Sequence, residues 1–167
     1  HSGQGTFVAP NACQKLRESR LSEKMNSTEY FDEVLECRIL IEGYACSLAA
    51  ERRTEKDLQF LRENSSRAKA FMEQHDEDGL NRCGAEFHSY LVGMTGNEII
   101  SDFYGSIIHA LLEERQEYYR VHADHLDVSY DEHMQLIQAL EERNGGLARE
   151  IVTHHLERKK RRQGLRK

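Results

Sequence analysis

Proline is nearly absent from this sequence: Pro10 is the single proline among 167 residues. Proline removes a backbone hydrogen-bond donor and clashes with the preceding turn, so it is the residue least compatible with a helix interior. No proline interrupts the chain after Pro10. The absence predicts an all-α protein.

The sequence also lacks paired cysteines and long apolar runs. Its four cysteines form no CxxC pair, which argues against a zinc ribbon and a CxxC redox motif. We expect them to be reduced and to serve in packing. No apolar run is long enough to cross a bilayer, and the start has no signal-peptide pattern. We therefore expect a cytoplasmic protein with no membrane partner.

Positive charge is concentrated at the end of the chain. The formal net charge is -6. The last ten positions nevertheless hold seven basic residues: Arg158, Lys159, Lys160, Arg161, Arg162, Arg166 and Lys167. The acidic body is not expected to bind a nucleic-acid backbone by itself, because phosphate binding depends on Lys and Arg. We interpret the basic end as a solvated helix terminus, with contact to DNA or an acidic neighbour as the alternative.

Apolar residues recur with the helical period from Glu29 onward. The pattern predicts an antiparallel bundle of about six helices. They are expected at 29–53, 55–74, 77–94, 99–112 with an end between 119 and 125, from a cap at Asp127 or Ser129 through 140, and 147–162. Thr54 and Asp57 form a variant capping box for the second helix. Gly96 is suited to ending the third helix, and Asn144-Gly145-Gly146 is expected to break the chain before the last.

Residues 1–10 differ in pattern from the rest. A turn at Gly3-Gln4-Gly5 leads into Thr6-Phe7-Val8, which predicts a short β-strand. An isolated strand cannot satisfy its own hydrogen bonds, so we expect the end of a preceding domain. The predicted organisation is a β-strand remnant at 1–10, a linker at 11–28, the helical domain at 29–163 and a basic tail at 164–167.

Three histidines, His88, His133 and His155, fall on the apolar stripes of three different predicted helices. Neutral imidazole is a common ligand for zinc, nickel, copper and iron, so three inward rings would form a metal site. The alternative is that each is a core histidine hydrogen-bonded to a carbonyl or a carboxylate. A metal-binding helix often carries a carboxylate one turn before its histidine, and that position holds Gly84.

Arg38 interrupts the apolar pattern of the first helix between Leu35 and Ile39, with Glu42 one turn later. One interpretation is a surface ion pair worth roughly a few tenths of a kcal/mol. The other is an arginine that reaches into a cavity and binds a carboxylate in bidentate fashion. Periodicity alone does not choose between them.

Four motifs follow one another along the chain: Glu36-x-Arg38-x-x-x-Glu42, Glu86-Phe87-His88 followed by Gly96-Asn97, Glu132-His133, and His155-Leu156. Their order and spacing resemble the FadR C-terminal (FCD) domain of GntR-family bacterial transcription regulators. The initial Gly3-Gln4-Gly5-Thr6-Phe7-Val8 resembles the wing strand that ends the winged helix-turn-helix of that family. The resemblance covers nearly the whole chain.

The resemblance implies a homodimeric, effector-sensing helical bundle, preceded by a winged helix-turn-helix domain that binds operator DNA. In the metal-binding branch of the family, an aspartate and three histidines hold a divalent ion beneath a pocket for a small organic acid. The histidines match His88, His133 and His155, and the aspartate matches Gly84. The resemblance thus implies zinc or nickel, with an open position for water or effector.

The resemblance also assigns effector-binding residues. Arg38 matches an arginine placed to meet an effector carboxylate, and Gly84 leaves an open coordination position. Asn81, two turns before His88 on roughly the same stripe, is expected to approach the ion through water. The function expected is a ligand-responsive transcription regulator. The alternatives are a metal-dependent enzyme with an open three-histidine site and a metal-free helical interaction module. No acid or base motif accompanies the histidines, which argues against the enzyme.

Overall fold

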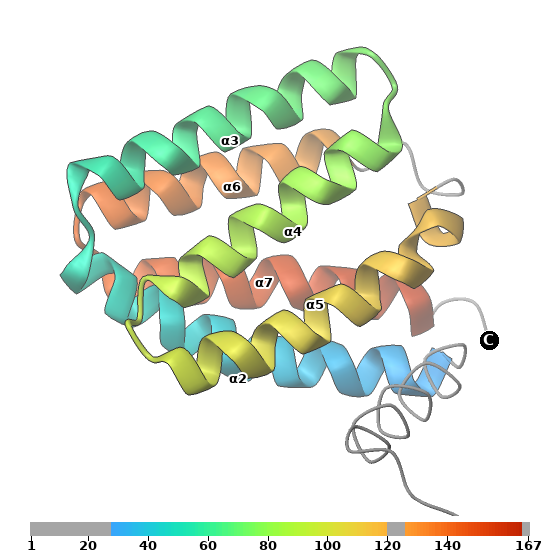
Figure 1. The fold of residues 1–167 in the computed structure, drawn as a ribbon, viewed down its shortest axis with the longest axis horizontal. Coiled ribbons are helices and arrows are strands. Elements are labelled where there is room, and N and C mark those ends of the chain that lie inside the picture. The colour runs from blue at the N-terminus through green and yellow to red at the C-terminus, as the bar shows by residue number, and fades with distance from the viewer. Residues whose placement is uncertain (1–27, 120–125, 165–167) are drawn as a thin grey trace, which may run out of the picture.

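The computed structural model describes residues 28–119 and 126–164, with side chains described for 32–108 and 129–161. These residues form six helices, labelled as in Figure 1, and no strand. The helices are α2 (Thr28–Arg52), α3 (Glu55–Glu73), α4 (Glu77–Gly93), α5 (Glu98–Tyr119), α6 (Leu126–Glu141) and α7 (Gly145–Gly164). The prediction of an all-α bundle is confirmed. The strand expected at 1–10, the linker up to residue 27 and the tail from 165 lie outside the described residues.

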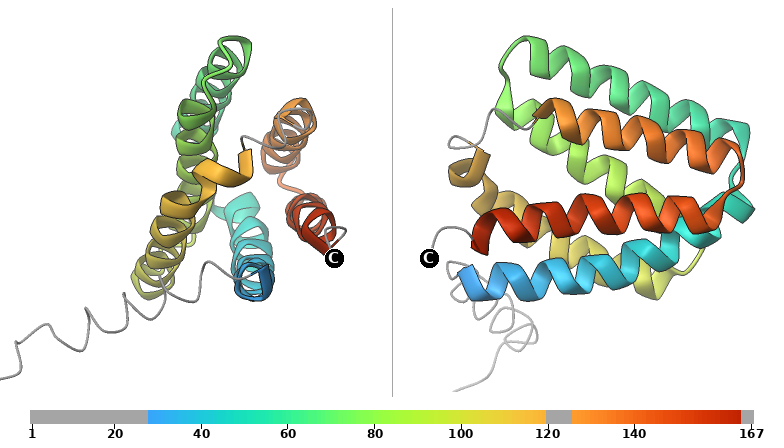
Figure 2. Two further views of the ribbon diagram at one scale, coloured as in Figure 1. Left: turned by 90° about the vertical axis from the view of Figure 1, so that its right-hand side faces the viewer. Right: turned by 180° about the vertical axis from the view of Figure 1, so that it is seen from behind.

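The helices pack in two layers. In the end-on view of Figure 2, α3, α4 and α5 form one layer, and α6, α7 and α2 lie on the other side. Neighbouring helices within each layer are in contact, and α3 packs on α6 between the layers. The most extensive helix–helix contact is between α2 and α7, which lie side by side (Figure 1). None of the described helices has the length and apolar character needed to span a membrane.

The core between the layers is made of apolar side chains from five of these helices. Its fully buried members include Leu35, Leu58, Leu61, Phe87, Leu91, Leu136, Leu140, Val152 and Leu156. They recur at three- and four-residue spacing, so burial of one apolar stripe per helix orients every helix about its own axis. Any polar residue on such a stripe is consequently carried into the interior.

Two predicted helix boundaries are confirmed by their caps. The Thr54 backbone N–H donates to Asp57 Oδ2 at 2.7 Å, and the Asp57 N–H donates to Thr54 Oγ1 at 3.3 Å. This reciprocal pair starts α3 as the capping box predicted. After α4, Gly96 takes a φ of +67°, the left-handed conformation that glycine adopts without strain.

The predicted cap of α6 is wrong, and the predicted start of α7 is two residues late. Neither Asp127 nor Ser129 caps α6, because that helix already begins at Leu126. The expected break before the last helix is present at residues 142–144, but α7 begins at Gly145 and not at Leu147, and Asn144 caps it by accepting from the Leu147 N–H at 3.0 Å. A Cβ at Gly145 would lie 2.9 Å from the Ser47 carbonyl oxygen, so glycine here permits close approach of α7 to α2.

Candidate metal centre

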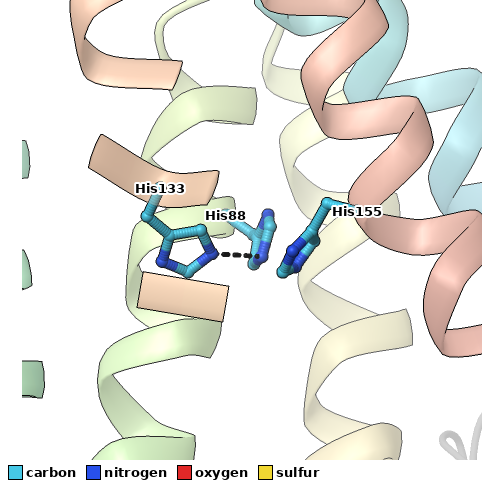
Figure 3. A group of neighbouring side chains, drawn as sticks. All are labelled: His88, His133 and His155. Atoms are coloured by element: carbon cyan, nitrogen blue, oxygen red, sulfur yellow. Dashed lines mark hydrogen bonds between the residues drawn. The ribbon is translucent and has the colours of Figure 1, made fainter. Parts of the chain in front are cut away.

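The structure brings His88, His133 and His155 together from α4, α6 and α7 (Figure 3). Each offers one ring nitrogen, and these three atoms lie within 4.8 Å of one another. The ring centroids are 5.0 to 5.2 Å apart, so the imidazoles form a nearly equilateral triangle. No other group of this kind occurs in the part of the chain that the structure describes.

The distances within the triangle suit a shared ion. His88 Nε2 and His133 Nε2 are 3.3 Å apart. Two nitrogens bound to one tetrahedral zinc at about 2.1 Å each would lie about 3.4 Å from each other. The observed separation is therefore one that a metal ion could occupy with little movement of either ring.

Two of the three rings lie against buried carboxylates. His155 Nδ1 lies 2.6 Å from Glu132 Oε2, and the opposite nitrogen, Nε2, is buried and has no hydrogen-bond partner among the described residues. His88 Nδ1 lies 2.7 Å from Glu42 Oε2, although the angles there do not make a hydrogen bond, and His88 Nε2 lies 3.3 Å from His133 Nε2. A carboxylate behind a ligating histidine fixes the ring orientation and leaves the other nitrogen free for the metal.

The third ring is positioned by an aromatic contact. His133 stacks on Phe87 with the ring centroids 4.2 Å apart and an interplanar angle of 4°. Phe87 precedes His88 on α4 and is itself fully buried in the core. The same turn of α4 therefore supplies one histidine and the flat surface that orients a second.

The three imidazoles are held neutral. Burial lowers the pKa of His88 to about 4, against the opposing effect of Glu42. Burial also lowers the pKa values of His133 and His155 well below their ordinary range, helped by the positive charges of Lys159 and Arg38. Metal binding requires the neutral ring, so these environments favour ligation at neutral pH.

The side of the centre next to Gly84 is open. Gly84 lies one turn before His88 on α4, and a Cβ placed on it would have no atom within 4 Å. Asn81, one further turn away, is buried, and its side-chain oxygen has no hydrogen-bond partner among the described residues. A side chain at position 84 would therefore have room to extend from α4.

Arg38 and Glu42 form a fully buried pair, with both side chains 0% exposed. The interpretation of Arg38 as a surface residue is therefore wrong. Its Nε donates to Glu42 Oε1 at 2.6 Å, whereas Nη1 and Nη2 have no hydrogen-bond partner among the described residues. The guanidinium keeps two donors of its fork available inside the protein.

Glu42 joins three groups from three helices. Besides Arg38 and His88, the Tyr104 hydroxyl of α5 donates to Glu42 Oε1 at 2.6 Å. Burial by itself would raise the pKa of Glu42, but Arg38 and His88 outweigh it and hold that pKa far below its usual range. The carboxylate is therefore ionised at neutral pH, and it connects the proposed effector arginine to a histidine of the triangle.

Sequence reasoning found the three histidines and Arg38 but missed the groups that support them. Glu132 was noted only as the neighbour of His133, yet it contacts His155 and accepts from Arg158 at 2.6 and 2.9 Å. Tyr104 had no sequence signal beyond its place on an apolar stripe. The expectation of a solvated basic end is wrong at Arg158, which is half-buried, and at Lys159, which is 9% exposed.

The chain is similar to proteins of one family. A model of the FCD domain matches residues 33–158. The HTH-type transcriptional regulator LutR of Bacillus subtilis is 26% identical over 158 residues, covering 92% of this chain and 71% of LutR. The solved structure of E. coli McbR/YncC has a TM-score of 0.74 at 16% identity, over 84% of this chain and 71% of that one. Streptococcus agalactiae GntR has a TM-score of 0.69 at 20% identity, over 96% and 72%.

Proposed function

The chain belongs to the FCD domain family of GntR-type regulators, and we propose that it binds a small organic acid beside a divalent metal ion. Binding of the acid would change the affinity of the regulator for operator DNA. The observation that carries the proposal is the triangle of His88, His133 and His155, with two of its rings against buried carboxylates. The family is one of transcription regulators, so the alternative of a metal-dependent enzyme is dropped.

The residues present fit a metal ion. His88, His133 and His155 would hold it, and the buried, unpartnered Nε2 of His155 is the clearest sign of a missing partner. Three neutral imidazoles suit zinc or nickel. A bound ion would supply positive charge and an open coordination position for an oxygen of the effector.

Arg38 is the residue proposed to bind the effector carboxylate. Its Nη1 and Nη2 are buried and lack partners among the described residues, while Glu42 holds its Nε. Two parallel donors match the two oxygens of a carboxylate. Gly84 and Asn81 complete the proposed effector side, because the first leaves space and the second has an oxygen without a partner.

DNA binding is proposed to belong to a winged helix-turn-helix domain that precedes the helical domain. In this division residues 1–10 end the wing, 11–28 form the linker, 29–163 form the sensing domain, and 164–167 form a basic tail. LutR, which is named an HTH-type regulator, is matched by this chain over 71% of its length, which supports a further domain. The proposed location is the cytoplasm, where operator DNA is found.

Operator binding by the intact regulator, measured with and without candidate organic acids, tests the proposal. An acid acts on DNA binding only if it binds two states of the protein with different affinities. We expect at least one acid to change operator affinity by about 5- to 150-fold, the usual range of allosteric coupling. The proposal fails if no acid changes operator affinity and none binds the protein.

A homodimer is proposed to form through an apolar face on α2 and α5. Four large apolar side chains are exposed there: Leu40, Tyr44, Ile99 and Phe103. Tyr44 and Ile99 line one surface hollow, so the two helices contribute to one continuous face. The centre of a subunit interface is enriched in aromatic residues, and this face exposes Tyr44 and Phe103.

Changing Leu40 and Phe103 together to aspartate is expected to convert the dimer to a monomer. Each buried aspartate would be an unpaired charge in the interface, which costs several kcal/mol. Sedimentation velocity at several protein concentrations measures the change. Met134→Asp is the matched control, because Met134 is also an exposed apolar residue but lies on α6. A double variant that still sediments as a dimer contradicts this choice of face.

Gly84→Asp is expected to raise zinc affinity by about 10- to 100-fold, because it adds an anionic ligand to three neutral ones. A Cβ at Gly84 meets nothing within 4 Å, so the helix accepts the side chain. Competition with a fluorescent chelator measures the affinity. Gly84→Ala is the control, since it makes the same backbone change without a carboxylate and should leave affinity unchanged. Equal affinity of the two variants would place Gly84 away from the ion.

A further inference from the structure

Arg158 is a basic residue near the end of α7 that the proposed function does not use. It lies three residues after His155 on that helix, and its side chain is only 14% exposed. Arg161, three residues further on, has a side chain that is 65% exposed. Arginine is rarely buried to this extent unless it is paired, so the partners of Arg158 indicate its role.

The guanidinium of Arg158 binds Glu132 of α6 through two donors. Its Nε donates to Glu132 Oε1 at 2.9 Å, and its Nη2 donates to Glu132 Oε2 at 2.6 Å. Nη2 also donates to Ser129 Oγ at 3.2 Å, one turn earlier on the same face of α6. Two parallel hydrogen bonds fix the plane of a carboxylate as well as its position, which a single contact does not.

The same carboxylate holds the proposed metal ligand His155. Glu132 Oε2 lies 2.6 Å from His155 Nδ1. A carboxylate only accepts hydrogen bonds, so the ring proton is on Nδ1 and the lone pair is on Nε2, the nitrogen proposed to bind the ion. Arg158, Glu132 and His155 therefore form a chain in which each group orients the next.

The contact of Arg158 with Glu132 also joins the two helices that carry His133 and His155. Glu132 immediately precedes His133 on α6, and Arg158 is one turn from His155 on α7. The ring centroids of His133 and His155 are 5.0 Å apart. A bidentate bridge so close to both residues limits how far α6 and α7 can separate there, and it thereby helps to keep the two rings at this distance.

We propose that Arg158 is a positioning residue of the metal centre, which acts through Glu132 to fix the orientation of His155. The inference rests on the proposed function and adds a residue to its site. Arg158 itself would not bind the ion, because a guanidinium has no acceptor. Loss of a group behind a metal ligand costs 10- to 100-fold in affinity, and Arg158 is one contact further away, so its loss should cost about tenfold.

Zinc affinity of the intact regulator, measured by competition with a fluorescent chelator, tests the role of Arg158. Arg158→Met should bind zinc about tenfold more weakly, and Arg158→Lys, which keeps the charge without the two parallel donors, should recover only part of the loss. Arg161→Met is the matched control on the same helix and should leave affinity unchanged. Arg62→Met removes another arginine–glutamate bridge to α6, at Glu141, so it controls for loss of an interhelical contact.

A double-mutant cycle separates positioning from a general effect on stability. If Arg158 acts through Glu132, its loss should matter little once the Glu132 carboxylate is gone. Arg158→Met made in a Glu132→Gln background should therefore change zinc affinity by less than about twofold. An effect of the same size in both backgrounds contradicts action through Glu132. Circular dichroism verifies that each variant is folded.

The outcomes separate this inference from the function on which it rests. Equal zinc affinity of Arg158→Met and the unaltered protein, or an equal loss in Arg62→Met, overturns the role of Arg158 while leaving the metal centre in place. Absence of zinc and nickel binding by the unaltered protein overturns the metal centre and this role with it. A loss that is specific to Arg158→Met and disappears in the Glu132→Gln background supports both.

Discussion

Replacing His155 with alanine is expected to lower zinc affinity by at least about 100-fold. Loss of a group behind a metal ligand typically costs 10- to 100-fold, and loss of the ligand itself should cost more. Only two imidazoles would remain, and Glu132 would lose the ring that it orients. Chelator competition measures the affinity, and elemental analysis of protein purified without a metal-affinity step gives the content of the unaltered chain.

The preceding residue provides a close control. His154 is 63% exposed at its side chain, whereas His155 is 2% exposed, although both are histidines on α7. His154→Ala should therefore leave zinc affinity unchanged. If His154→Ala and His155→Ala behave alike, or if the unaltered protein binds no zinc or nickel, the three histidines are structural. The domain would then sense its effector without a metal.

Replacing Glu42 with alanine is expected to lower the free energy of unfolding by about 3–5 kcal/mol. Removal of one partner of a buried ion pair leaves the other charge buried and uncompensated, which is strongly destabilising. Arg38 would be that charge, and the Tyr104 hydroxyl would lose its acceptor as well. Urea unfolding followed by circular dichroism measures the change.

Glu36, another glutamate of α2 that forms an ion pair, provides the comparison for Glu42. Glu36 pairs with Lys160, but the Glu36 side chain is 63% exposed, so Glu36→Ala should cost less than about 1 kcal/mol. The double variant Arg38→Met with Glu42→Leu should recover most of the lost stability, because apolar residues can replace a buried pair. A cost for Glu42→Ala no larger than that for Glu36→Ala would contradict the burial of the pair.

Much of the fold follows from local sequence signals. The helical period places each apolar stripe, and the capping box at Thr54 and the glycine at Gly96 set boundaries through short-range hydrogen bonds and backbone conformation. Helix boundaries are predicted less well where packing between helices determines them. The sequence predicts the break at Asn144-Gly145-Gly146 but not that Gly145 belongs to α7, where its lack of a side chain allows close packing on Ser47.

The site divides in the same way. His88, His133 and His155 were identifiable because each lies on a stripe that must face the core, whatever the partner helix. Their carboxylate partners were not identifiable, because Glu42 meets His88 only through the packing of α2 on α4. Burial of Arg38 likewise depends on which helices cover it. The apolar period of a helix predicts which side chains face the core. It does not predict which residues of the other helices they contact.

The carboxylate of Glu42 also limits how this protein can change over generations. Loss of Glu42 leaves the Arg38 charge buried without its partner, and loss of Arg38 leaves the Glu42 charge with only His88 and Tyr104, at a cost that is a large fraction of the stability of a typical domain. A lineage that came to use an uncharged effector would have to exchange both residues at nearly the same time. The two positions should therefore be inherited as a pair, with Tyr104 freer to vary because its loss removes one hydrogen bond and leaves the ion pair in place.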